Sequence, residues 1–113
     1  MIGGVTRDEY IAATRALITE GERIRERPSM PALRTWIAAS DELLSNAWGP
    51  MDRYHLSWLM VGRPAEAVRG RAMTDEETAD YVREVAIAKT AALRMSLKAV
   101  DEDGMPFLGE TPA

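Results

Sequence analysis

The sequence predicts an all-α protein: an irregular four-helix bundle with two long and two shorter helices and an acidic, flexible C-terminal tail. Apolar residues recur at three- and four-residue spacings, as they do on one face of an α-helix. Serine or threonine precedes several of these stretches, and glycine or proline follows them, as at helix ends. No segment alternates apolar and polar residues as a half-buried strand does. With 113 residues, we expect one helical domain over residues 1–100 and the tail over residues 101–113.

The first helix is expected to begin at Thr6, because Glu9 follows it at the spacing of a capping box. Its buried face is marked by four large side chains, Tyr10, Leu17, Ile18 and Ile24. Gly21 lies on the same face, where a missing side chain admits a close neighbour. Pro28 and Pro31 end this helix.

A second helix is expected after Ser29, with Pro31 tolerated in its first turn. It ends at the pair Gly49-Pro50. A short third helix follows over about residues 52–61, and Gly62 closes it.

The fourth helix has the clearest start, a capping box from Thr74 to Glu77. It is expected to run for about 26 residues, or roughly 39 Å, far longer than the third helix. Three apolar residues near its end, Leu93, Leu97 and Val100, would then have few neighbours within the chain. This length mismatch predicts a homodimer whose second copy covers them.

Composition excludes several classes of protein. The chain has no cysteine and carries a net charge of −4, so disulfides and zinc–thiolate sites are excluded. The first residues lack the basic and apolar regions of a signal peptide, and no apolar run approaches the ~20 residues of a membrane span. We therefore expect a cytoplasmic protein with no membrane association.

Few residues could support catalysis. His55 is the single histidine, and Asp52 lies three residues before it, where a carboxylate could orient the ring. A metal site of this type needs a second histidine-bearing motif, and the glycine patterns of phosphate-binding loops are absent. We expect His55 to be hydrogen-bonded near a helix start, and a non-enzymatic protein without metal or cofactor.

Large apolar and aromatic residues suggest a protein-binding role. A partner-binding surface could be formed by Trp36, Trp48, Trp58, Phe107 and Leu108. Residues of these types are common at interfaces, although the same tryptophans at helical spacing are also typical of a core. The favoured function is therefore an adaptor or regulator that self-associates and binds a protein partner.

The alternative is a DNA-binding regulator. Residues 43–64 read as a helix, a glycine turn and a short helix, a layout that looks like a helix-turn-helix. Candidate nucleic-acid contacts are Arg53, Tyr54, Ser57, Arg63, Arg69 and Arg71. The acidic net charge opposes phosphate binding. The same basic segment could instead hold the tail, with Phe107 as its anchor.

Overall fold

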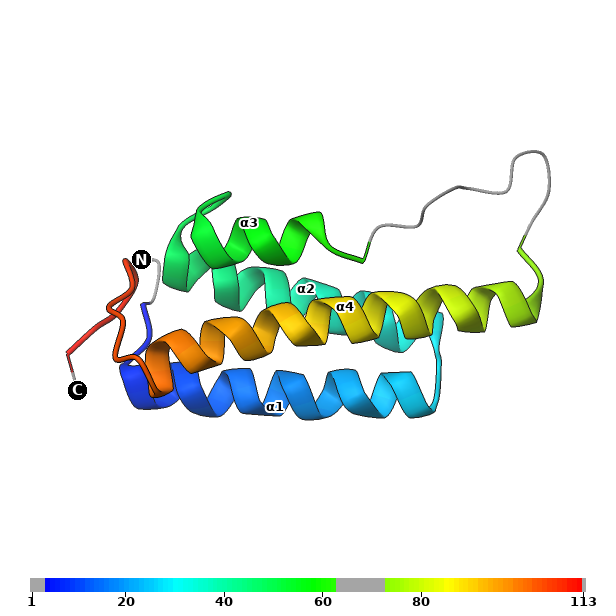
Figure 1. Ribbon diagram of the computed structural model, residues 1–113, viewed down its shortest axis with the longest axis horizontal. Coiled ribbons are helices and arrows are strands. Elements are labelled where there is room, and N and C mark those ends of the chain that lie inside the picture. The colour runs from blue at the N-terminus through cyan, green and yellow to red at the C-terminus, as the bar shows by residue number, and fades with distance from the viewer. Residues whose placement is uncertain (1–3, 63–72, 113) are drawn as a thin grey trace.

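The computed structural model describes residues 4–62 and 73–112 and forms a bundle of four helices (Figure 1). They are α1 (Arg7–Glu26), α2 (Met30–Trp48), α3 (Arg53–Met60) and α4 (Asp75–Asp101). The all-helical class predicted from the sequence is confirmed. The helices α1 and α4 are the two longest, with 20 and 27 residues, and α2 and α3 have 19 and 8.

Side-chain caps fix where each helix begins. Thr6 and Thr74 both form the reciprocal capping boxes that the sequence predicts, with Glu9 and Glu77 as their partners. The α2 helix begins after Ser29, whose hydroxyl accepts a hydrogen bond from the Ala32 amide. Each cap satisfies amide groups that have no partner within the first helical turn.

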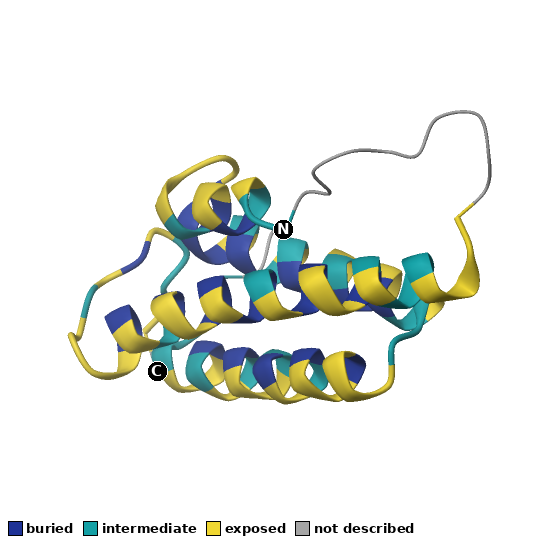
Figure 2. Cartoon of the chain, turned by 45° about the vertical axis from the view of Figure 1, so that its right-hand side comes forward, coloured by how far each residue is buried: buried dark blue, intermediate teal, exposed yellow. Residues whose placement is uncertain are grey.

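Neighbouring helices run in opposite directions along the long axis of the molecule (Figure 1). The most extensive packing is between α1 and α4, while α3 lies against both α2 and α4. Each helix buries one side and exposes the other (Figure 2). Within the described residues, no helix combines the length and apolar character needed to cross a bilayer.

The end of α4 is better covered than the sequence suggested. Leu93 and Val100 are fully buried within the single chain, and Leu97 is half-buried. The predicted shortage of neighbours is therefore wrong at these positions, because α1 packs along the C-terminal half of α4. It is the N-terminal turns of α4 that extend beyond α1 and α2 (Figure 1).

The C-terminal segment requires a second correction. Residues 102–112 pack against the ends of the helices, and the backbone of Val5 pairs with that of Gly109 and Thr111. The Gly109 amide also donates to the Ala47 carbonyl over 2.7 Å. A Cβ atom at Gly109 would lie 2.1 Å from the Asn46 carbonyl oxygen, so this approach requires glycine. The flexible tail expected from composition is thus a docked segment up to residue 112.

Candidate functional site

The three tryptophans lie in the core and do not form the exposed surface proposed from the sequence. Trp36, Trp48 and Trp58 are almost completely buried. The Trp36 indole donates to the Leu17 carbonyl over 2.8 Å, and the Trp58 ring lies under the Lys89 ammonium at 4.1 Å. Their rings hold the helices together because each one fills the space between neighbouring helices. They are not available to a partner in this conformation.

A buried polar chain links three helices near one end of the bundle. The Trp48 indole donates to the Tyr10 hydroxyl over 2.9 Å, and that hydroxyl donates to Ser96 Oγ over 3.0 Å. Ser96 in turn donates to the Leu93 carbonyl. Burial raises the pKa of the Tyr10 hydroxyl, and the hydrogen bonds with Ser96 and Trp48 offset part of that rise. The chain is a structural feature, because no part of it reaches the surface.

Phe107 joins this aromatic cluster, while its neighbour Leu108 points to solvent. The Phe107 side chain is 6% exposed, with its ring centroid 4.9 Å from that of Tyr10 and 5.8 Å from that of Trp48. Leu108 is 82% exposed. Of the two tail residues proposed for partner binding, only Leu108 is therefore accessible.

Arg7 fixes the docked tail. Its guanidinium makes two hydrogen bonds to the Glu110 carboxylate, at 2.8 and 3.1 Å, and also donates to the Val100 and Met105 carbonyls. It lies 5.8 Å from the centroid of the Phe107 ring. The anchor of the tail is thus at the helix ends. Among the described residues of the basic segment, the contact from Arg53 to the Met105 sulfur, at 3.4 Å, matches the predicted fold-back of the tail.

His55 is buried, and both of its ring nitrogens have partners. The Met51 amide donates to Nδ1 over 2.8 Å, so Nε2 carries the proton that points to Asp41 Oδ1 at 2.6 Å. Asp52, the partner expected from the sequence, instead caps α3 by accepting from the Arg53 amide. The prediction of a hydrogen-bonded histidine near a helix start is confirmed. Neither nitrogen is free to accept a proton from a substrate or to bind a metal ion.

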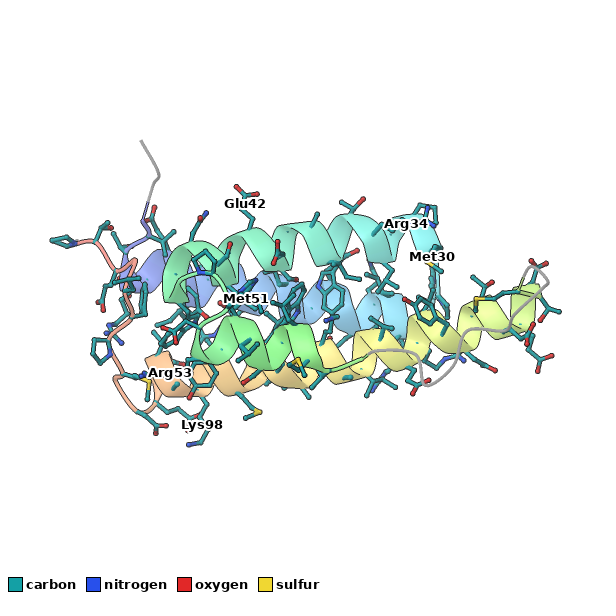
Figure 3. All side chains as sticks on the ribbon, turned by 90° about the horizontal axis from the view of Figure 1, so that it is seen from above. Met30, Arg34, Glu42, Met51, Arg53 and Lys98 are labelled. Atoms are coloured by element: carbon teal, nitrogen blue, oxygen red, sulfur yellow. The ribbon has the colours of Figure 1, made fainter. Side chains whose placement is uncertain are left out.

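An exposed apolar surface lies on α3 and on the turn before it. It consists of Met51, Leu56 and Met60, which we call the α3 surface. Leu56 and Met60 are one helical turn apart and therefore share a side of α3. Met51 lies in the turn between α2 and α3 (Figure 3), with an unusual φ of 63°. Its amide is held by His55, so the bond to His55 helps to fix the conformation of this turn.

Within the described residues, α2 and α3 do not form the crossed pair of a helix-turn-helix. In Figures 1 and 3, α2 and α3 run side by side in opposite directions, whereas the helices of that motif cross at about 90–120°. Tyr54 packs on Trp48 with a centroid distance of 4.7 Å, and Ser57 donates to the Arg53 carbonyl. Of the described candidates Arg53, Tyr54 and Ser57, only Arg53 has an exposed basic side chain. Arg63, Arg69 and Arg71 lie outside the described residues.

A shallow groove of about 560 Å³ runs between α1 and α4. Its basic residues are Arg15, Arg94 and Lys98, which pair with Asp101, Glu22 and Asp103 respectively. Since each cation has a carboxylate partner, the groove offers no concentrated charge to an anionic ligand. Among residues 4–62 and 73–112, no group of three or more potential ligands could hold a metal ion.

Two features of the site could not be found by local inspection of the sequence. Arg7 and Glu110 meet over a separation of 103 residues, and Asp41 reaches His55 from another helix. Comparisons with protein-family models, curated proteins and solved structures gave no match to the chain.

Proposed function

We propose that this chain is a non-enzymatic adaptor or regulator of the cytoplasm that self-associates and binds a protein partner through the α3 surface. The observation that supports partner binding is the group of Met51, Leu56 and Met60, exposed within ten residues of sequence. Isolated exposed apolar residues are ordinary. In contrast, α1 and α2 expose no large apolar side chain in the described part of the chain. The concentration on the shortest helix is what favours a binding role.

The chemistry and backbone of the α3 surface suit protein recognition. Methionine side chains are flexible and polarisable, and they adapt to varied apolar partners. The turn that carries Met51 leads directly into Arg53, the first residue of α3, which has a positive φ of 25°. Uncommon backbone conformations such as these gather at binding and catalytic sites. Catalysis is not favoured, because both His55 ring nitrogens are engaged, Nδ1 by the Met51 amide of this turn and Nε2 by Asp41 on α2.

The proposal is tested with a double substitution, Leu56→Glu with Met60→Glu. It places two charges on the exposed side of α3 and is expected to reduce capture of the partner in native cells about tenfold or more. The measurement is quantitative cross-linking and mass spectrometry of the tagged chain. The matched control is Ala12→Glu with Ala16→Glu, an exposed pair at the same spacing on α1. A partner that both variants retain equally would contradict the role of the α3 surface.

DNA binding is expected to be absent. Titration of a fluorescent duplex at physiological salt should show no binding, because the α2–α3 geometry and the acidic net charge both oppose it. Arg53→Glu should change the free energy of unfolding by no more than about 0.5 kcal/mol, as for most surface substitutions. Submicromolar, salt-sensitive binding that Arg53→Glu weakens would contradict this prediction and restore the helix-turn-helix interpretation.

A further inference from the structure

A stripe of exposed residues runs along the outer side of α4, and its C-terminal end borders the groove between α1 and α4. Its members, which we call the α4 stripe, are spaced alternately by four and three residues: Asp80, Glu84, Ile87, Ala91, Arg94 and Lys98. All six are exposed, and exposed residues follow α4 along its length (Figure 2). Alternating spacings of this kind keep residues aligned toward a second helix.

The charges of the α4 stripe are divided by position. Asp80 and Glu84 lie toward the N-terminal end of α4, and Arg94 and Lys98 lie toward its C-terminal end. In an antiparallel pair of α4 helices centred near position 89, Glu84 of each copy would face Arg94 of the other. Asp80 would face Lys98 in the same register. A parallel pair would bring like charges together, so the pattern selects the antiparallel arrangement.

The middle of the α4 stripe is apolar. Ile87 is 49% exposed and borders a hollow of about 360 Å³ that also includes Ala88. In the same antiparallel register, Ile87 of one copy faces Ala91 of the other, and the small alanine leaves room for it. Met95, 59% exposed, lies on the same outward side. Two copies would therefore bury an apolar centre flanked on each side by two pairs of complementary charges.

We infer that two copies of this chain associate through the α4 stripe, with their two α4 helices packed antiparallel. A two-fold symmetric interface must contain its own complement, because the same patch serves both copies, and this stripe does. The ion pairs that Asp80, Arg94 and Lys98 make within the chain are exposed and weak, so their exchange for intermolecular pairs is feasible. The inference rests on the proposed self-association and names its surface.

Charge reversal tests both the surface and the register. Dimerisation of the full chain is measured by sedimentation velocity over a concentration series, with circular dichroism to verify folding. Glu84→Arg and Arg94→Glu are each expected to raise the dimer Kd about tenfold, because like charges then face each other. The combination Glu84→Arg with Arg94→Glu restores opposite charges and should return the Kd to near the wild-type value.

Matched controls lie on other faces. Glu42→Arg makes the same charge change on α2, at the edge of the molecule opposite Lys98 (Figure 3), and should leave the Kd unchanged. Ile87→Glu should abolish dimerisation, whereas Met60→Glu, at a residue 58% exposed on α3, should not.

The outcomes separate the inference from the proposed function. A dimer that persists unchanged in Glu84→Arg, Arg94→Glu and Ile87→Glu would overturn the α4 stripe as the interface, while self-association would stand. A wild-type chain that remains monomeric at millimolar concentration would overturn self-association itself and this inference with it. Partner capture through the α3 surface is measured separately and does not depend on either result.

Discussion

Replacing Phe107 with alanine is expected to lower the free energy of unfolding by about 3–5 kcal/mol, the usual range for a buried phenylalanine. The ring is 6% exposed and packs between Tyr10 and Trp48 at the end of the bundle. Its removal would leave a cavity beside the ring of Tyr10, whose hydroxyl takes part in the hydrogen bonds that link three helices. Urea unfolding followed by tryptophan fluorescence measures the change, because all three tryptophans are in the core.

Leu108 provides the matched control for this prediction. It is the next residue in the chain and is 82% exposed, so Leu108→Ala should change the free energy of unfolding by no more than about 0.5 kcal/mol. The two substitutions remove apolar side chains from adjacent positions and differ mainly in burial. Similar, small effects of both would show that the tail does not dock on the helices in solution.

The sequence predicted the helices well because their starts depend on short-range contacts. At Thr6 and Thr74, a hydroxyl and a carboxylate three residues apart form each capping box, so both partners are visible within one turn of sequence. The buried stripe of α1 was also predicted, since Tyr10, Ile18 and Ile24 lie in the core and Leu17 is half-buried. Such features need no knowledge of the tertiary structure.

The docked tail could not be predicted for the opposite reason. Acidic residues with glycine and proline are typical of mobile segments, and composition gives no weight to a single phenylalanine. The position of Phe107 depends on Arg7, which binds Glu110 from the far end of the chain. Only the tertiary fold brings these two residues together.

The exposed face of α3 was ambiguous for a different reason. Apolar and aromatic residues occur on every side of this short helix, so periodicity cannot choose which side is buried. The structure buries His55 and Trp58 and exposes Leu56 and Met60. The buried side of α3 is determined by contacts from other helices: Asp41 on α2 binds His55, and Lys89 on α4 donates to the Trp58 carbonyl. Sequence periodicity therefore does not predict the α3 surface, and residue type alone wrongly predicts that the three tryptophans are exposed.

Gly21→Ala is expected to lower the free energy of unfolding by about 1–3 kcal/mol, as overpacking of a filled core does. Alanine is intrinsically the better helix former by about 1 kcal/mol, so an exposed site would be stabilised by the same change. Gly21 is buried where α1 meets α2 and α4. An added Cβ would lie 2.1 Å from Thr90 Oγ1 and 2.8 Å from Trp36 Cζ2, and the indole is held in place by its bond to Leu17.

The source of the strain can be tested with Thr90→Ala. This substitution removes the oxygen that the new methyl group would strike, and that oxygen has no hydrogen-bond partner within the described residues. The double variant Gly21→Ala with Thr90→Ala should therefore be destabilised by less than the sum of the two single variants. The contact with Trp36 remains, so recovery should be partial. Additive effects, or a Gly21→Ala variant as stable as the wild type, would mean that α1 and α4 are further apart than the structure places them.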